Sequence, residues 1–406
     1  MRIGIFTDTY PPYINGVSTS IKMLENALRK KGHKVFVVTV NPDNMKYVYE
    51  DNGRIMRIPG IKTGIYDYRL TSIYPVKALK KIKSWNLDVI HSQSEFGIGT
   101  YARIVSNKLN IPIVHTYHTM YEDYIHYITH GYFDKTSRKI VEYLTKFYCD
   151  KSIEELIVPT KKTYDLFKGK YHYDRNIHII PTGIEIDRFY KENIDINKIK
   201  ALKEKYQLEN NLVILFVGRI ASEKNIDFLI NNHSSIIKKY GNVKLLIVGD
   251  GPDLENYKKI VAKKNLDNNI IFTGKVPWDE IPIYYNVADI FTTASHTETQ
   301  GLTVVEAMAA SLPVIALNDE SFQNTVINSL TGYLFNNKKE YIKYMLELIE
   351  DDKKRLYMGD QGRINAETYS SKYFADRVLD VYKLAIKKGR CKKGILNKIK
   401  NIFKRK

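Results

Sequence analysis

The chain has 406 residues, of which 44% are hydrophobic, and its formal net charge is +18 with a pI near 9.4. This length predicts two or three domains. No run approaches the roughly 18 apolar residues that span a bilayer, and a strand pattern begins directly at Met1, so we expect neither a transmembrane helix nor a secretory signal. The two cysteines, Cys149 and Cys391, exclude a disulfide framework and a cysteine-based metal site, so we expect a reducing, cytoplasmic setting.

The first half of the chain alternates apolar strand patterns with helical stretches. Residues 2–8 and 35–40 read as strands around a helix at 18–30, which predicts a β-loop-α-β unit and a parallel sheet. Gly16 lies in the loop before this helix, which lacks G-x-G-x-x-G, so no dinucleotide site is expected there. Further strands are predicted at 54–59, 88–92, 112–118, 155–159 and 178–181.

Three other features of this half carry predictions. Residues 72–85 form an amphipathic, basic helical pattern, which usually packs on its own sheet. His118 ends a predicted strand, and the carboxyl ends of strands face the ligand crevice of an open α/β sheet, although a lone histidine is more often structural. The polar run 191–197 is interpreted as an interdomain linker.

The second half begins with a continuous apolar strand, Leu212–Val217, as expected for a sheet covered on both faces. Arg219 and Lys224 follow, just before a helix predicted from residue 226, where two cations suit a diphosphate; a surface turn is the alternative. Gly249-Asp250-Gly251-Pro252 is interpreted as a structural turn. Further strands are predicted at 243–248, 270–273, 289–293, 313–317 and 332–335.

The stretch 295–308 combines two carboxylates with the start of a helix predicted at 302–310. The backbone N–H groups of Gly301, Leu302 and Thr303 open this helix and suit an anion. Glu298 and Glu306 flank that position, and carboxylates there are suited to accept hydrogen bonds from hydroxyl groups. A ligand with hydroxyls at both ends and a diphosphate between them is a nucleotide sugar. Glutamates around a helix start are also common as dipole partners.

The C-terminus concentrates positive charge. Its last 20 residues hold ten positive and no negative charges, so the net charge without them is 18 − 10 = +8. Apolar residues recur at helical spacing among the lysines, at Ile395, Leu396, Ile399, Ile402 and Phe403. We expect this segment to bind an anionic membrane surface, with a disordered basic tail as the alternative. A nucleic-acid-binding protein would also explain the pI, but no recognised nucleic-acid module occurs.

These motifs resemble those of the retaining glycosyltransferases of family 4, which have the GT-B fold, and the resemblance covers nearly the whole chain. It rests on Gly218-Arg219 with Glu223-Lys224, on the Glu298/Glu306 pair, and on residues 181–189, which resemble P-x-G-I-D-x-x-x-F with Glu185 in place of Asp. The run 115–127 looks most like the bacterial 1,2-diacylglycerol 3-alpha-glucosyltransferases within this family.

The resemblance implies an α/β protein with two Rossmann-like domains facing a cleft. Residues 1–190 would form the acceptor-side domain and residues 198–369 the nucleotide-sugar-binding domain. A helix at 370–386 would cross back to the first domain, and residues 387–406 would form the basic amphipathic tail.

The resemblance also implies roles for individual residues. Catalytic positions are His118 near the donor sugar, Arg219 and Lys224 at the leaving diphosphate, and Glu298 at the sugar hydroxyls. Further residues would bind the phosphates and the nucleobase of the donor, and Glu306 would bind its ribose diol. These donor-binding positions are Gly16, Gly218, Lys275, Val276, Gly301, Leu302, Thr303 and Glu306. No metal is expected, because Asp-x-Asp is absent and two cations already stand at the diphosphate.

The implied activity is hexosyl transfer with retention from a nucleotide sugar, UDP-glucose by resemblance, to diacylglycerol, with no further cofactor. In related lipid glycosyltransferases a basic helix lies on the membrane, so residues 72–85 are a second candidate for membrane contact. The expected location is the inner face of the cell membrane, as a peripheral protein. Donors such as GDP-mannose or UDP-galactose, and a soluble or cell-wall glycan acceptor, remain alternatives, and the sequence indicates no oligomeric state.

Overall fold

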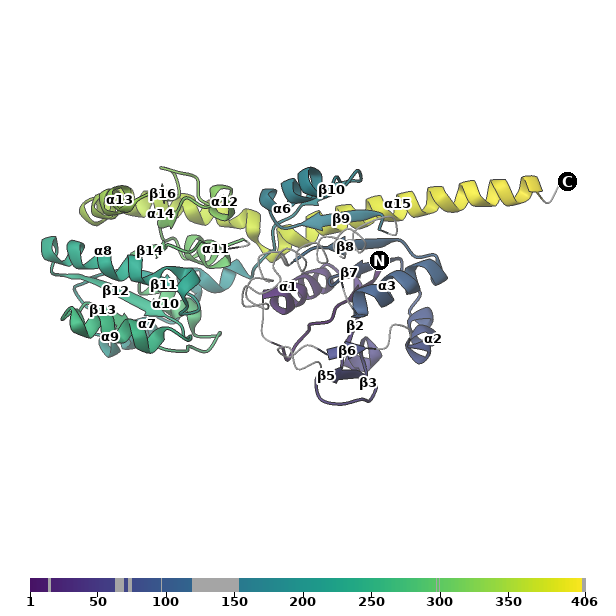
Figure 1. The fold of residues 1–406 in the computed structure, drawn as a ribbon, viewed down its shortest axis with the longest axis horizontal. Coiled ribbons are helices and arrows are strands. Elements are labelled where there is room, and N and C mark those ends of the chain that lie inside the picture. Colours follow the sequence, from purple (N-terminus) through teal and green to yellow (C-terminus); the bar gives the residue numbers. More distant parts are fainter. Residues whose placement is uncertain are drawn as a thin grey trace. The chain divides into compact units, whose positions relative to one another are not determined.

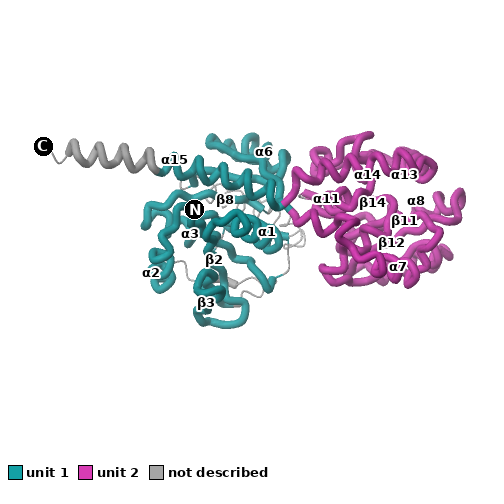
Figure 2. The backbone as a smooth tube through the Cα atoms, turned by 180° about the vertical axis from the view of Figure 1, so that it is seen from behind, with its two compact units in different colours: residues 1–183, 371–406 teal, residues 184–370 magenta. Residues whose placement is uncertain are grey.

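The computed structural model describes residues 1–13, 16–62, 69–71, 75–95, 97–118, 153–296, 298 and 300–403, and for residues 62, 69–70 and 390–403 the description is limited to the backbone. The chain forms two compact units (Figure 2). Unit 1 comprises Met1–Gly183 and Ser371–Lys406, and unit 2 comprises Ile184–Ser370.

Unit 1 contains an eight-stranded sheet of order β10-β9-β8-β7-β1-β2-β4-β3, in which β3 is antiparallel to β4 and the other pairings are parallel. A two-stranded antiparallel sheet joins β5 to β6. The strands are β1 Arg2–Phe6, β2 Lys34–Val40, β3 Val48–Glu50, β4 Ile55–Ile58, β5 Gly60–Lys62, β6 Arg69–Thr71, β7 Val89–Ser92, β8 Ile113–Thr116, β9 Glu155–Val158 and β10 Ile177–Ile179.

Helices cover both faces of this sheet (Figure 1). The described helices of unit 1 are α1 Gly16–Lys30, η1 Asp51–Gly53, α2 Val76–Ser84, α3 Gly97–Leu109, α6 Lys161–Asp165, η2 Leu166–Lys170 and α15 Ser371–Phe403. Alternate strand residues enter two cores, because successive side chains in a strand point to opposite faces. In β2, Val35 and Val37 pack with α1 and α15, whereas Val38 and Val40 pack with α2 and α3.

Unit 2 contains a six-stranded parallel sheet of order β13-β12-β11-β14-β15-β16. Its strands are β11 Leu212–Val217, β12 Val243–Val248, β13 Ile270–Phe272, β14 Ile290–Thr293, β15 Val314–Leu317 and β16 Gly332–Phe335. Its helices are η3 Ile186–Phe189, η4 Lys191–Asn193, α7 Ile196–Lys205, η5 Ser222–Lys224, α8 Ile226–Lys239, α9 Leu254–Lys263, α10 Ile281–Asn286, α11 Leu302–Ala309, α12 Glu320–Gln323, α13 Lys338–Glu350, α14 Asp352–Ala366 and η6 Glu367–Tyr369.

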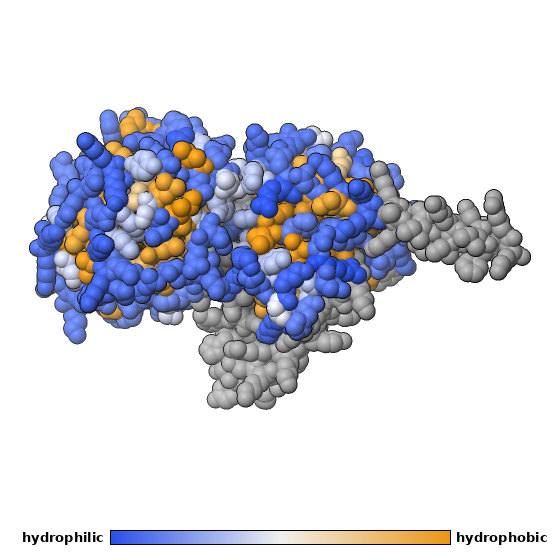
Figure 3. Space-filling model, turned by 90° about the horizontal axis from the view of Figure 1, so that it is seen from above, coloured by the Kyte–Doolittle hydropathy of each residue, from blue (hydrophilic) through white to orange (hydrophobic). Residues whose placement is uncertain are grey.

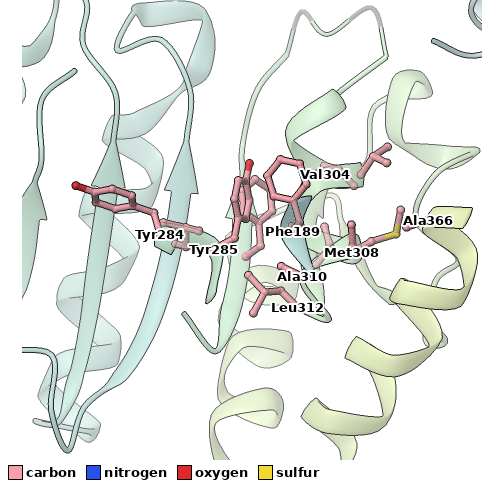
Figure 4. Close-up of a cluster of buried hydrophobic side chains, with 14 of the residues drawn as sticks. Phe189, Tyr284, Tyr285, Val304, Met308, Ala310, Leu312 and Ala366 are labelled. Carbon is pink, nitrogen blue, oxygen red and sulfur yellow. The ribbon is translucent and has the colours of Figure 1, made fainter. Parts of the chain in front are cut away.

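The apolar run of β11 is buried on both sides, as the sequence predicts. Val213 and Leu215 join the core that contains α7, α10 and α11, whereas Ile214 and Phe216 join the core that contains α8, α9 and α13. In the first of these cores the ring of Phe189 meets the ring of Tyr285 edge to face, with 5.3 Å between centroids (Figure 4). This contact joins η3 to α10, and η3 also packs against α11, the helix predicted to bind the donor.

Several boundaries differ from those expected. Residues 191–197 are not an interdomain linker, because the chain passes from unit 1 to unit 2 after Gly183 and returns at Ser371, so this run lies inside unit 2. Ile184, Ile186 and Phe189 are buried in the core of unit 2. Unit 2 therefore begins at Ile184, earlier than the predicted domain boundary at residue 190. α2 begins at Val76, and residues 72–74 lie outside the described part of the chain.

The C-terminal helix is longer than the predicted 370–386. α15 runs to Phe403 as one helix, while residues 404–406 and the side chains from residue 390 onward lie outside the description. No helix within the described ranges combines the length and the apolar character needed to cross a bilayer.

Candidate active site

The carboxyl ends of β11 and β14 form the switch point of the sheet in unit 2. β12 and β13 extend the sheet on one side of β11, and β14 to β16 extend it on the other. Because the chain winds in opposite directions from this point, the loops after β11 and β14 diverge and leave room for a ligand. These two loops, residues 218–225 and 294–301, contain half of the ten site residues predicted for the second half of the chain, namely Gly218, Arg219, Lys224, Glu298 and Gly301.

An ion pair joins these two loops. Lys224 Nζ lies 2.5 Å from Glu298 Oε1, and the two side chains are 17% and 22% exposed. Ser295 Oγ donates to the same carboxylate oxygen at 3.1 Å. The backbone N–H of His296 adds a second link, because it donates to the carbonyl of Glu223 at 3.3 Å. The structure therefore brings together two of the predicted site residues and fixes both.

Arg219, the other predicted cation of this loop, is exposed and has no ion-pair partner among the residues that the structure describes. Because Lys224 is already paired with Glu298, Arg219 is the cation of this loop whose guanidinium remains available to an anion. Gly218 stands directly before it. The turn after β12 packs backbone to backbone against Gly218: a Cβ on Gly249 would lie 1.9 Å from the Gly218 carbonyl oxygen, so Gly249 has the structural role expected of it.

The start of α11 is open to a ligand. Gly301 is its N-cap with a φ of 65°, and a Cβ there would lie 2.4 Å from Phe322 Cε1, so only glycine fits. Gly301 offers no side-chain cap, and within the described part of the chain no group bonds to the first N–H groups of the helix, at Leu302 and Thr303, which can therefore bind water or an anion. The positive end of the helix dipole adds to this attraction.

Glu306 lies one turn further along α11. The hydroxyl of Tyr285, from α10, donates to Glu306 Oε2 at 2.7 Å. Burial raises the pKa of this carboxyl to about 7, against the opposing effects of the Tyr285 hydrogen bond and of the Arg188 charge. A hydroxyl group that donates to Glu306 would stabilise its ionised form. This local environment therefore suits the diol of a bound nucleoside.

The turn after β13 holds Lys275 and Val276. Val276 packs against the core of unit 2, whereas Lys275 is exposed. Trp278 follows, and the Arg188 guanidinium stacks on it with 3.2 Å from Cζ to the ring centroid. Arg188 also donates to the Trp278 carbonyl at 3.2 Å. Val276 and this stack anchor the turn, which leaves its backbone in a fixed position.

Unit 1 has its own switch point, between β1 and β7. Gly16 begins α1 after β1, and His118 follows β8, which pairs with β7, so both predicted residues lie at the carboxyl edge of this sheet. A Cβ on Gly16 would meet no atom within 4 Å, and internal packing therefore does not require glycine there. The run 119–127, used for the closer resemblance, lies outside the described residues.

The ring of His118 is held by a hydrogen bond to the buried side-chain amide of Gln93. Its Nε2 lies 2.6 Å from Oε1 of Gln93, which follows β7. Burial lowers the pKa of His118 to about 4; the nearby Glu95 opposes this shift and His115 reinforces it. His118 is therefore neutral near pH 7.

Sequence reasoning missed Ser295, Gln93 and Tyr285. Ser295 and Gln93 both lie within two positions of a strand end, and the rule that singled out His118 would have found them had it been applied to every polar residue. Tyr285 gave no such signal. It reaches Glu306, 21 positions later, only because α10 packs beside α11.

Comparison with known proteins matches both halves of the chain to glycosyltransferases. Residues 14–188 match the family described as Glycosyltransferase Family 4, and residues 198–365 match the family described as Glycosyl transferases group 1. The alpha-monoglucosyldiacylglycerol synthase of Acholeplasma laidlawii is 35% identical over 389 residues, which cover 94% of this chain and 96% of the relative. The enzyme of the same name from Streptococcus pneumoniae is 36% identical over 86% of this chain and 78% of the relative.

The fold is similar to that of a solved sucrose-phosphate synthase from Thermosynechococcus elongatus. The TM-score is 0.70 at 19% identity, and the match covers 94% of this chain and 98% of that structure. The predicted GT-B fold is confirmed.

Proposed function

We propose a lipid glucosyltransferase, from the premise that this chain belongs to the family 4 glycosyltransferases. It transfers a glucosyl residue from a nucleotide sugar to diacylglycerol, with retention at the anomeric carbon, to give a monoglucosyl lipid. The favoured donor is UDP-glucose. Support for the lipid acceptor comes from two relatives, each over 30% identical along most of the chain, that carry the name alpha-monoglucosyldiacylglycerol synthase.

The observation that carries this proposal is the set of groups around the switch point of unit 2. Two cations, the open start of α11 and two carboxylates meet there. An anion fits the cations and the helix N-terminus, and hydroxyl groups fit the carboxylates, so one ligand with both chemistries uses the whole set. Unit 2 is accordingly the donor-binding domain, and unit 1 is the acceptor-side domain.

Each group then has one task in donor binding. Glu306 accepts hydrogen bonds from the ribose diol, beside the nucleobase at the backbone of Lys275 and Val276. The diphosphate lies against Arg219, Lys224 and the N–H groups of Leu302 and Thr303. Gly218 and Gly301 leave space for its approach, and Gly16 is proposed as a further phosphate-binding residue on the basis of the family resemblance. Glu298 accepts from the sugar hydroxyls, and His118 contacts the sugar near the reacting carbon.

The reaction breaks the bond between the anomeric carbon and the diphosphate oxygen and forms a bond to the acceptor hydroxyl oxygen on the same face of the sugar. Negative charge grows on the leaving diphosphate, where Arg219 and Lys224 stabilise it; preorganised stabilisation of this kind usually contributes more to catalysis than any other single effect. The acceptor proton passes to the departing phosphate oxygen. No metal takes part in this proposal.

We place the enzyme on an anionic membrane surface, at the inner face of the cell membrane. α15 leads into the basic segment at the C-terminus, whose side chains lie outside the description. The described part of α15 also borders a groove of about 730 Å³ that has apolar walls at Ile177, Ile179 and Leu384, with two cations, Lys161 and Arg377, and one anion, Asp380, in its lining. Apolar residues gather within hydrophilic ones on this face of unit 1 (Figure 3). An apolar face whose charged neighbours are more basic than acidic suits an anionic bilayer interface.

A donor panel tests the proposal. The full-length protein is incubated with labelled UDP-glucose, UDP-galactose or GDP-mannose and with vesicles that contain diacylglycerol. We expect label in a monoglycosyl lipid with UDP-glucose, and an α-linkage in its NMR spectrum. Transfer from GDP-mannose alone, or to a soluble glycan alone, would contradict the proposed substrates.

A further inference from the structure

A chain of buried hydrogen bonds runs from His118 to the C-terminal helix within unit 1. Gln93, His91, Thr116 and Tyr382 form it, and each of the four is at most 6% exposed. His118, at the exposed end of this series of hydrogen bonds, is partly exposed and bonds to Gln93 Oε1 through Nε2 at 2.6 Å. No group in the described part of the protein bonds to its other ring nitrogen, Nδ1.

Both ring nitrogens of His91 already have partners. Nδ1 lies 2.7 Å from the hydroxyl of Tyr382 on α15, and Nε2 lies 2.7 Å from Thr116 Oγ1 on β8. Burial lowers the pKa of His91 well below its ordinary value, and the neighbouring His118 and His115 lower it further. Burial also raises the pKa of Tyr382 above its ordinary value. The pair is therefore a neutral imidazole and a neutral phenol.

The position of the Gln93 amide relative to His91 decides its orientation. Its Nε2 lies 3.1 Å from His91 Nδ1 and 3.3 Å from His91 Nε2. A donor in the ring plane would be close to one nitrogen and far from the other, so the nearly equal distances place the amide nitrogen over the ring face. An N–H group is attracted by the electron-rich face of a neutral ring, whereas a carbonyl oxygen would be repelled. The NH₂ group of Gln93 therefore faces His91, and its carbonyl oxygen faces His118.

This orientation sets the proton of His118. A carbonyl oxygen can only accept, so His118 Nε2 must carry the hydrogen, and the neutral ring then leaves Nδ1 bare. We propose that Gln93 is a positioning residue that holds His118 in its Nε2–H tautomer, so that the bare Nδ1 accepts a hydrogen bond from a hydroxyl group of the bound sugar. Tyr382 and Thr116 are positioning residues behind it, because they fix the His91 ring on which the Gln93 amide rests.

The proposal rests on the proposed function for the sugar, but the tautomer itself does not. The wild-type full chain, labelled with ¹⁵N in its histidine rings, tests it directly, because protonated and bare ring nitrogens resonate in separate regions. The chain has ten histidines, and the His118 signals are those lost in His118→Ala. We expect a protonated Nε2 and a bare Nδ1 for His118 near pH 7. A protonated Nδ1, or a rapid mixture of the two tautomers, would overturn the proposal whether or not the protein transfers glucose.

Variants connect the tautomer to binding. Gln93→Leu should move both His118 resonances toward a tautomer average and raise the donor KM about tenfold, with a smaller change in kcat. Gln93→Glu keeps the acceptor oxygen, so it should keep the Nε2–H tautomer. Tyr382→Phe should give a smaller shift in the same direction as Gln93→Leu.

The matched control is Tyr101→Phe. It also removes a fully buried hydroxyl in unit 1, one that donates to the Pro75 carbonyl at 3.2 Å, and it should leave the His118 resonances unchanged. Equal spectra for wild type and a folded Gln93→Leu would overturn the proposal. If the spectra behave as expected but no labelled sugar is transferred, the proposed function fails and the tautomer assignment stands.

Discussion

Lys224 Nζ lies 2.5 Å from Glu298 Oε1, 74 positions later in the sequence. This ion pair distinguishes Lys224 from Arg219, the other cation at the switch point of unit 2. Lys224 is balanced within the protein, whereas Arg219 has no ion-pair partner in the described part of the chain. Loss of Lys224 would leave a partly buried carboxylate unpaired, and loss of Arg219 would not.

Arg219→Ala should therefore lower activity without a loss of stability. We expect kcat to fall by about 10²-fold, the usual effect of removing one group that stabilises transition-state charge. The thermal midpoint should stay within about 1 °C of wild type, since surface changes without lost contacts cost little. Lys258→Ala is the control, because it removes an exposed cation from α9 whose ion pair, with Glu255, lies within the same helix. Activity near wild type in Arg219→Ala would contradict its assigned role.

Glu306 should make stability depend on pH. The folded carboxyl keeps its proton up to a pKa of about 7, whereas the ordinary value is 4.5. The folded chain thus binds more protons between these values, so this contribution is full below pH 4.5 and is lost as pH rises to 7. Glu306→Gln stays neutral, and its stability relative to wild type should rise over this window by on the order of 1–2 kcal/mol. Thermal unfolding of both proteins across that range measures the difference.

Donor binding should release a proton from the same carboxyl. Hydroxyl groups that donate to Glu306 favour its ionised form, so the bound nucleotide lowers its pKa. Calorimetric titration with UDP at pH 6.5, in two buffers of different ionisation enthalpy, reports the proton released. We expect a buffer-dependent heat for wild type and none for Glu306→Gln. The same buffer dependence in both proteins would remove Glu306 from the nucleotide site.

Two glycines at the predicted site should respond differently to alanine. Gly301 has a φ of 65° and lies against Phe322, so Gly301→Ala should cost about 1–3 kcal/mol of stability. Gly16 has open space around the position of a Cβ, so Gly16→Ala should leave the thermal midpoint unchanged. If the donor phosphates approach Gly16, the variant should still raise the donor KM about tenfold. An unchanged KM in Gly16→Ala would show that the ligand does not come close to this residue.

Much of this site could be predicted from sequence, because strand ends and helix starts have local signatures. Arg219, Lys224, Glu298 and Gly301 all follow apolar strands, and parallel strands bring such loops to one edge. The ion pair between two of them was not predicted, since it depends on the pairing of β11 with β14. The linker was misplaced because residues 191–197 are polar, whereas the burial of Ile184 and Phe189 that ties this segment to unit 2 appears only in the fold.

Activity should survive chelation of divalent metals. The proposed site places Arg219, Lys224 and the start of α11 at the diphosphate, where they supply the positive charge that a metal would otherwise provide. We expect at least half of the wild-type rate in excess EDTA. A complete loss that magnesium or manganese restores would show that a metal ion carries this charge.

The basic C-terminal segment should bind anionic membranes, and the structure determines where to cut it. Lys388 Nζ lies 2.5 Å from Glu155 Oε1, a carboxylate on β9 with no exposed surface, so a truncation that includes Lys388 would leave a buried charge without this partner. The informative truncation therefore removes residues 391–406, which carry seven positive charges, and keeps Arg390. On an anionic bilayer each cation would contribute about 1 kcal/mol, and an apolar helix face would be buried at the interface.

Flotation with phosphatidylglycerol vesicles and with phosphatidylcholine vesicles measures this role. Full-length protein should bind only the anionic vesicles and dissociate as salt rises, whereas the truncated protein should bind at least tenfold more weakly. Its transfer to diacylglycerol in vesicles should fall in parallel, while transfer to detergent-dispersed diacylglycerol should change less. Lys388→Ala in the full-length chain is the control, because it weakens the contact with Glu155 while keeping the seven charges of the removed segment. Equal flotation of the full-length and truncated proteins would place the membrane contact elsewhere, with α2 and the groove beside α15 as the next surfaces to change.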